Sequence, residues 1–218
     1  MIDPASRRSR VLDEIAAAAR RAGRPPEAVT LVAVSKTRSV AEIEPLIAAG
    51  QRDFGESRVQ EAEAKWPDLR AAHPDLHLHL IGRLQSNKAA EAIALFDVIH
   101  SLDRASLLDS LVTAAQKAGR FPAVYVQVNI GAEEQKGGVA LDALPDFLDQ
   151  VRASPLPLAG LMAIPPQGVE PGPFFALLAK LARRHDVSGL SMGMSGDYTT
   201  AVMLGATVVR VGTALFEN

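Results

Sequence analysis

Short apolar runs alternate with longer helix-forming segments along the whole chain, and this alternation is the main indication of its fold. The run from Val29 to Val34 is nearly unbroken and rich in β-branched residues, which is typical of a strand buried on both faces of a parallel sheet. Further apolar runs predict strands at residues 53–55, 76–81, 96–100, 123–130, 156–164, 189–192 and 206–211. Capping residues, glycines and prolines delimit predicted helices at residues 3–22, 40–49, 58–66, 86–95, 103–117, 141–152, 173–184 and 198–204.

Strands that alternate with helices eight times predict an α/β protein with a closed parallel (β/α)8 TIM barrel and an extra N-terminal helix. Because several of the predicted strands are short, an open doubly wound sheet also fits the pattern alone. The chain has no internal repeat or linker, and the proline- and glycine-rich stretch 165–173 is interpreted as one extended loop. We therefore predict a single domain that spans residues 1–218.

The composition narrows the classes of function. Hydrophobic residues make up 48% of the 218 residues and charged residues 22%, as expected for a globular protein with a substantial core. A net charge of −2 gives no general attraction to nucleic acid or to an anionic membrane. The chain has no cysteine, which excludes disulfides and thiolate chemistry. Only His77 and His79 have a ligand-like spacing, and this pair alone does not predict a metal site.

The N-terminal residues predict a location in the cytoplasm. They lack the apolar core of a signal peptide, and no apolar run of the chain is long enough to span a bilayer.

Lys36 directly follows the first predicted strand, in the sequence Ser35-Lys36-Thr37. The carboxyl ends of parallel strands are where α/β proteins bind their ligands. Partial burial at such a position would favour the neutral amine that Schiff-base chemistry requires. The alternative is a lysine that only marks the exit of the strand into solvent.

Two loops rich in glycine and hydroxyl residues follow the last two predicted strands, at residues 191–197 and 210–214. In (β/α)8 barrels the loops after strands seven and eight commonly bind phosphate. Glycine lets backbone N–H groups approach an oxyanion, and Ser and Thr hydroxyls donate further hydrogen bonds. Either loop alone also fits ordinary turn chemistry, but together they favour an anion site formed by Ser191, Ser195, Gly212 and Thr213.

Arg210 interrupts the apolar strand 206–211, and a buried arginine needs a partner. The partner is either a carboxylate, such as that of Glu56 or Asp197, or an atom of a ligand. Other polar clusters also follow predicted strands and are expected to contribute to both the site and barrel packing; they lie at residues 55–57, 85–88 and 127–129.

Eight motifs along the chain are familiar as a set: Ala33–Thr37, Asp53–Glu56, His79–Lys88, His100–Asp103, Gln127–Ile130, Gly160–Pro165, Leu190–Ser195 and Val209–Ala214. Together they resemble the pyridoxal-phosphate homeostasis protein family, whose members are similar to the barrel domain of bacterial alanine racemase. The resemblance covers essentially the whole chain, in order, and favours the closed barrel over the open sheet.

The resemblance implies a cofactor, pyridoxal 5′-phosphate (PLP), and a role for each matching residue. Lys36 matches the family's Schiff-base lysine, and Arg210 falls where the family places an arginine against the pyridine nitrogen. The family's phosphate-binding cup falls on Ser191, Ser195, Gly212 and Thr213.

The chain departs from the family pattern at two positions. Ser57 stands where the family usually has Asn, and Gly137 stands where it usually has Ser. The departure at Ser57 puts in doubt any contact that the family's Asn makes beside the cofactor.

Three functions from different classes remain open. The one we expect is a non-catalytic protein that binds PLP as its ligand and supports PLP homeostasis, with PLP-dependent apo-enzymes as further partners. An alanine-racemase-like enzyme is the first alternative, and a barrel enzyme for a phosphorylated sugar or aromatic precursor is the second. The non-enzyme is favoured because Tyr125 and Tyr198, the two tyrosines, lie away from predicted strand ends. The strand count leaves no further domain within this sequence, and we expect a monomer rather than a dimer.

Overall fold

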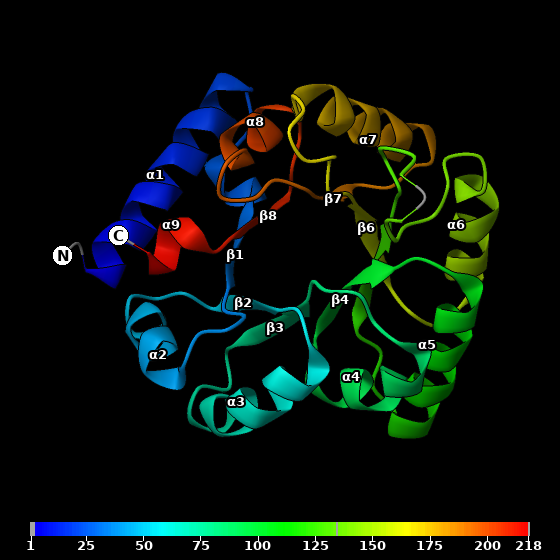
Figure 1. The fold of residues 1–218 in the computed structure, drawn as a ribbon, viewed down its shortest axis with the longest axis horizontal. Helices are drawn as coiled ribbons and strands as arrows, with labels where there is room; N and C mark the ends of the chain where they lie inside the picture. The colour runs from blue at the N-terminus through cyan, green and yellow to red at the C-terminus, as the bar shows by residue number, and fades with distance from the viewer. Residues whose placement is uncertain (1–2, 134, 218) are drawn as a thin grey trace.

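The computed structural model describes residues 3–133 and 135–217 and shows eight parallel strands joined in chain order into a closed barrel (Figure 1). The barrel closes because β8 pairs with β1, with Val32 beside Arg210. This closure confirms the predicted (β/α)8 fold and excludes the open sheet. The strands are β1 (Thr30–Val34), β2 (Asp53–Glu56), β3 (His77–Leu80), β4 (Val98–Leu102), β5 (Ala123–Gln127), β6 (Leu158–Met162), β7 (Gly189–Ser191) and β8 (Val208–Val211).

Helices form a ring around the strands in Figure 1. Their apolar residues pack against the outer face of the sheet in one continuous core. Two short 3-10 helices, η1 (Pro26–Ala28) and η2 (Ser86–Lys88), lie in the connections. The α-helices are α1 (Pro4–Arg21), α2 (Val40–Ala48), α3 (Val59–Ala72), α4 (Ala89–Leu95), α5 (Ala105–Ala118), α6 (Leu144–Ala153), α7 (Gly172–Arg184), α8 (Tyr198–Met203) and α9 (Thr213–Phe216).

The extra N-terminal helix α1 is present and begins as the sequence predicts. The Asp3 side chain caps it by accepting a hydrogen bond from the Ser6 amide, and Pro4 takes the first helical position. The helix packs beside α8 and α9, so the two ends of the chain lie close together (Figure 1). Its Glu14 carboxylate accepts a hydrogen bond from the Tyr198 hydroxyl at the start of α8.

Several predicted boundaries are wrong, among them the end of one helix, the start of another and the end of one strand. The helix expected to end before Pro67 continues through it to Ala72, because its buried Trp66 and Leu69 anchor both sides of the proline against the core. Arg104, rather than Asp103, is the residue before α5, and the Asp103 carboxylate binds the Arg104 guanidinium instead. The fifth strand ends at Gln127, after which the chain makes an isolated bridge to Val139.

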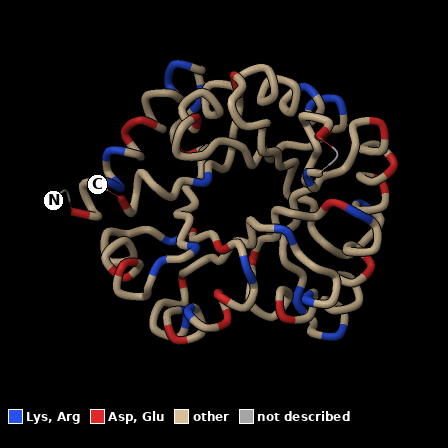
Figure 2. Tube along the Cα trace, in the orientation of Figure 1, with Lys and Arg blue, Asp and Glu red and all other residues tan. Residues whose placement is uncertain are grey.

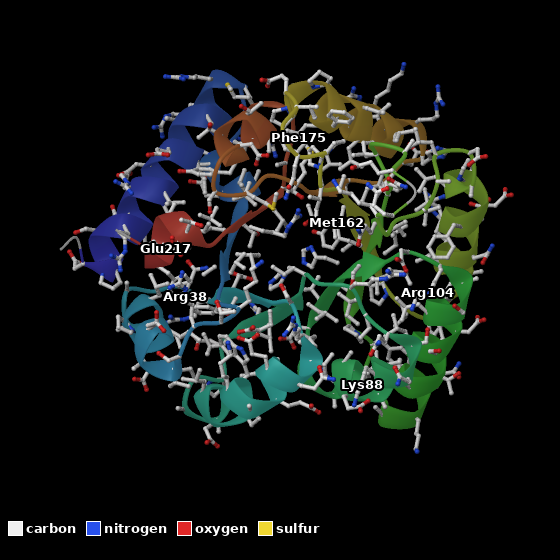
Figure 3. The ribbon with its side chains drawn as sticks, in the orientation of Figure 1. Arg38, Lys88, Arg104, Met162, Phe175 and Glu217 are labelled. Atoms are coloured by element: carbon white, nitrogen blue, oxygen red, sulfur yellow. The ribbon has the colours of Figure 1, made fainter. Side chains whose placement is uncertain are left out.

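The barrel interior combines a small apolar cluster with a set of buried polar side chains. The apolar cluster contains Val32, Tyr125, Met162 and Val208, and Figure 3 labels Met162 near the centre of the ring. Strands β6 and β7 approach closely at Gly160, where an added Cβ would lie 2.2 Å from a backbone oxygen of β7. The buried polar residues of the interior are His79, His100, Ser191 and Arg210.

Basic and acidic residues are interspersed around the ring of helices, without one face of a single sign (Figure 2). In the described part of the chain, none of the helices has the length and apolar character needed to cross a membrane.

Candidate functional site

A cavity of about 560 Å³ lies at the carboxyl ends of the strands. Five of the predicted site residues line it, namely Lys36, Ser195, Arg210, Gly212 and Thr213. They come from β8 and from the segments that follow β1, β7 and β8, so the barrel brings together residues up to 177 positions apart (36 to 213). The remaining lining residues are Val34, Ser57, Ile81, Gly82, Arg83, Gln127, Gly137, Ile164, Met194 and Gly196.

Lys36 lies in a constrained loop after β1. Its side chain is exposed, so the partial burial expected for it is not found. Within the described residues its amine makes no hydrogen bond or ion pair and is free to react with a ligand. The next residue, Thr37, has a φ of 63°, which is a strained value for a β-branched residue. The Glu61 carboxylate holds this conformation by accepting a hydrogen bond of 2.5 Å from the Thr37 amide.

Lys65 and Glu56 support the same loop from beneath. The Lys65 ammonium donates to the backbone oxygens of Ser35 at 3.0 Å and Arg38 at 3.2 Å, on either side of Lys36. Glu56 is fully buried, and its Oε1 lies 2.7 Å from the Lys65 Nζ. The same oxygen accepts hydrogen bonds from the Ser35 hydroxyl at 2.8 Å and the Trp66 indole at 3.0 Å. Glu56 therefore pairs with Lys65, and its suggested pairing with Arg210 is wrong.

Arg210 is a buried cation, 3% exposed, that lines the cavity. Its guanidinium donates to the Ser191 hydroxyl and, at 3.2 Å, to the Ala163 carbonyl. Among the described residues no carboxylate lies within ion-pair distance of it, and Asp197 instead accepts a hydrogen bond from the Met194 amide. Burial lowers the pKa of Arg210 to about 10, and this shift is opposed by Asp197 and Tyr125. A buried cation without a carboxylate partner favours a ligand acceptor in the cavity.

Ser191 lies behind Arg210 and is not among the residues that line the cavity. Its hydroxyl is 2.8 Å from His100 Nδ1, His100 Nε2 is 2.9 Å from His79 Nδ1, and His79 Nε2 is 3.1 Å from Asp53 Oδ1. The guanidinium can only donate and the carboxylate can only accept, and the series of side chains between them links the two groups across the barrel interior. Burial lowers the pKa of His100 and so favours its neutral ring, which can accept at one nitrogen and donate at the other. In the structure the Ser191 hydroxyl contacts Arg210 and His100, and its role in phosphate binding stays a prediction.

His100 makes the stability of the fold sensitive to acid. Burial, together with the nearby His79 and the Arg210 cation, lowers the pKa of His100 well below its usual 6.5. The unfolded chain then binds more protons than the folded chain, so stability is complete above pH 6.5 and falls as the pH drops below it.

We expect the free energy of unfolding to decrease by about 1.4 kcal/mol per pH unit below that point because of this group. Urea unfolding between pH 5 and 7 measures the slope. The variant His100→Gln should lose this contribution, whereas Tyr125→Phe, which keeps the ring that stacks on His100 at 4.5 Å, should retain it. Equal slopes in His100→Gln and the parent would contradict this assignment.

The loops after β7 and β8 form a connected wall of the cavity. The Ser195 hydroxyl accepts a hydrogen bond of 3.1 Å from the Gly212 amide and so ties the two loops together. Thr213 is exposed and Ser195 is partly exposed, so both hydroxyls can reach a ligand. The wall therefore has two hydroxyl groups that suit a phosphate group.

The His77 and His79 rings share one carboxylate partner. Both rings face the Asp53 carboxylate, at 3.6 Å and 3.1 Å, but His77 is exposed and His79 is buried. Among the described residues there is no group of three or more His, Asp or Glu side chains that could hold a metal ion.

The sequence analysis did not single out Arg83 or Met194, which also line the cavity. Arg83 lies three residues after the end of β3, and Met194 lies between the two predicted phosphate-loop serines. The sequence signal that could have identified them as site residues is that each follows a predicted strand. Ser57 and Gln127, from two of the predicted polar clusters, do line the cavity.

The fold and the cavity together define a (β/α)8 barrel protein with a ligand site at the carboxyl ends of its strands. The family described as "Alanine racemase, N-terminal domain" matches residues 8–217. A protein of Synechocystis sp. named "Pyridoxal phosphate homeostasis protein" is 41% identical over 203 residues, covering 88% of this chain and 93% of that protein. The chain belongs to the pyridoxal phosphate homeostasis protein family, which has the fold of the alanine racemase N-terminal domain.

Two solved structures extend the comparison. PipY of Synechococcus elongatus PCC7942, determined with PLP bound, is 40% identical and superposes with a TM-score of 0.81, covering 94% of this chain and 99% of that one. An alanine racemase from Clostridium difficile has a TM-score of 0.68 at 13% identity, and the match covers 94% of this chain but only 58% of the racemase. The second likeness establishes the shared barrel fold.

Proposed function

We propose that this chain binds PLP in the cavity at the carboxyl ends of its strands and serves intracellular PLP homeostasis without catalytic turnover. The observation that carries the proposal is the buried Arg210, a cation that lines the cavity and has no carboxylate within ion-pair distance in the described part of the chain. The PLP-bound PipY structure and the names of the relatives support the same ligand.

The residues present fit this cofactor. Lys36 has an exposed amine that can bond covalently to an aldehyde, and Arg210 can donate to the pyridine nitrogen. The hydroxyls of Ser195 and Thr213 suit the phosphate, and Gly212 lies beside them in the same wall of the cavity. When bound, PLP supplies an aldehyde and an electron-withdrawing ring.

The phosphate assignment is tested by removing hydroxyl donors. Hydrogen bonds to a charged group contribute about 1.5–3 kcal/mol each, so Ser195→Ala and Thr213→Val should each weaken PLP binding about tenfold or more. Fluorescence titration with PLP measures the affinity. Thr199→Val, on α8 and outside the cavity lining, is the matched control. Unchanged affinity in the double variant Ser195→Ala/Thr213→Val would place the phosphate elsewhere.

The absence of turnover is argued from the groups around the cavity. A guanidinium cannot accept a proton, so Arg210 favours the unprotonated pyridine ring, which is a weaker electron sink. Racemisation also needs a second acid or base on the opposite face of the cofactor. Tyr125 lies inside the barrel against His100, and the Tyr198 hydroxyl is bound to Glu14. Neither tyrosine lines the cavity.

We expect no amino-acid turnover at an enzymatic rate. Incubation of the PLP-loaded protein with L-amino acids in deuterated water, followed by NMR, measures exchange at Cα and racemisation. Both should proceed no faster than with free PLP. Exchange well above that level, abolished in Lys36→Ala, would instead establish the racemase-like alternative.

The proposal extends to the partners and the location. PLP-dependent apo-enzymes in the cytoplasm are the proposed recipients, and residues 1–218 act as one domain and as a monomer. The exposure of Lys36 supports this, because a cofactor held at an open site can be passed to another protein. Transfer to an apo-enzyme while free PLP is trapped tests delivery, and light scattering tests the monomer.

A further inference from the structure

A second cavity lies beside the first, between the loops that follow β2 and β3. We call it the outer pocket; its volume is about 570 Å³, within the range of small-molecule sites. Four basic side chains line it, and none of its lining residues is acidic. The full lining is Ser57, Arg58, Val59, Gln60, Arg83, Leu84, Gln85, Ser86, Lys88 and Arg104.

Two of the four cations are held in place by neighbouring groups. Arg104 donates to the Leu84 carbonyl at 3.0 Å and the Ser86 hydroxyl at 3.2 Å, and it pairs with Asp103 at 2.5 Å. Lys88 pairs with Glu91 at 2.9 Å, which raises the pKa of the lysine. Figure 3 labels Lys88 and Arg104 on the α4 and α5 side of the ring.

Arg58 and Arg83 have no such partner. Both side chains are exposed, and within residues 3–133 and 135–217 neither makes a hydrogen bond or an ion pair. Glu61 is close enough to Arg58 to interact with its charge, but the Glu61 carboxylate is already bound to Lys65 and to the Thr37 amide. The outer pocket therefore holds about two unbalanced positive charges.

The backbone adds donors to the same pocket. Val59 and Gln60 begin the 14-residue helix α3, which no side chain caps, and their amides have no acceptor in the described part of the protein. Free amides at a helix N-terminus favour an anion. Arginine guanidinium groups match the oxygens of phosphate in a bidentate arrangement. Two unpaired arginines beside two free amides thus suit a dianionic phosphate monoester.

The outer pocket adjoins the cofactor cavity directly. Ser57 and Arg83 line both. The two loops between the cavities pack tightly, since a Cβ added to Gly82 would lie 2.2 Å from the Ser57 backbone oxygen. A phosphate bound in the outer pocket would therefore lie next to the cofactor cavity. Arg83, which lines both cavities, could contact a phosphate in either of them.

We propose that the outer pocket is a second binding site for a phosphate monoester, and that its ligand is PLP itself on the way into or out of the cofactor cavity. The identity of the ligand rests on the proposed function, whereas the anion site rests on the outer pocket alone. The alternative ligand is another phosphorylated small molecule, which would present the same phosphate group to the outer pocket.

Anion binding is tested first in a background with an impaired inner site, Lys36→Ala/Thr213→Val. Calorimetric titration uses inorganic phosphate and pyridoxamine 5′-phosphate, which has the phosphate but no aldehyde. Both should bind, and adding Arg58→Gln/Lys88→Gln should weaken them about tenfold or more. The control Arg20→Gln/Lys117→Gln removes the same charge from exposed ends of α1 and α5 and should change affinity less than about twofold. Equal affinity in the two charge variants overturns the anion site.

The passage of PLP is tested by stopped-flow absorbance on the chain with an intact inner site. Arg58→Gln/Lys88→Gln should slow PLP uptake about fivefold or more while leaving the final absorbance of the loaded protein unchanged. Added inorganic phosphate should slow uptake in the parent protein but not in this variant. If phosphate binds but uptake is equally fast in both, the ligand is another phosphate monoester and the role in passage is overturned. A parent protein that acquires no PLP absorbance overturns the proposed function, and the calorimetry still decides the anion site.

Discussion

Replacing Lys36 by alanine is expected to abolish covalent attachment of PLP. The Lys36 amine lines the cavity, is exposed, and has no hydrogen-bond or ion-pair partner among the described residues. Borohydride reduction of the PLP-loaded protein, followed by digestion and mass spectrometry, should place the pyridoxyl group on the peptide that contains Lys36. The variant should retain weak binding through the phosphate donors but lose the absorbance of the covalent complex.

Two other lysines are informative for this experiment. Lys136 is adjacent to Gly137 in the cavity lining but pairs with Glu133 at 2.6 Å, and Lys88 lines the outer pocket. Labelling mainly on either of them would refute the assignment of Lys36. Lys117→Ala, which removes an exposed lysine near the end of α5, should label as the parent does.

Replacing Glu56 by alanine is expected to produce the largest loss of stability among the site variants. Glu56 is fully buried and Lys65 is nearly so, and removing one partner of a buried ion pair costs about 3–5 kcal/mol. The substitution also removes the acceptor of the Ser35 hydroxyl and the Trp66 indole. Urea unfolding at pH 7 measures the change in the free energy of unfolding.

The effect of Glu56→Ala on covalent PLP attachment at Lys36 distinguishes a role of Glu56 in positioning the lysine from a purely structural role. Lys65 holds the backbone on both sides of Lys36, so Glu56→Ala should also reduce the extent of covalent PLP attachment under conditions where the variant is folded. Glu63→Ala, on the same helix α3 but without a hydrogen bond or ion pair to the loop among the described residues, should alter neither quantity. A Glu56→Ala protein as stable as its parent would show that the ion pair makes no net contribution to the free energy of unfolding.

The sequence predicted the fold and much of the candidate site because both depend on local patterns. Apolar runs mark strands, and the polar residues that follow them fall at one end of any closed parallel barrel. This reasoning reaches Lys36, Ser195 and Thr213, which all line the cavity.

Contacts across the barrel could not be predicted in the same way. His100 and Ser191 are 91 residues apart and meet only because β4 and β7 face each other across the interior. The suggested pairing of Glu56 with Arg210 was wrong for the same reason, since its actual partner Lys65 lies on the outer helix α3 and cannot be inferred from the strand pattern. The continuation of α3 through Pro67 depends on tertiary packing, which overrides the local preference of proline.

The series of hydrogen bonds from Arg210 to Asp53 also constrains how this barrel can evolve. Its members lie on β8, β7, β4, β3 and β2, and Ser191, His100 and His79 each contact a neighbour on both sides. Changing one of these three leaves the polar groups of its neighbours unmatched, at about 1–3 kcal/mol for each orphaned buried group. Descendants of this sequence should therefore keep or lose the interior residues as a set, while the loop residues around them vary independently.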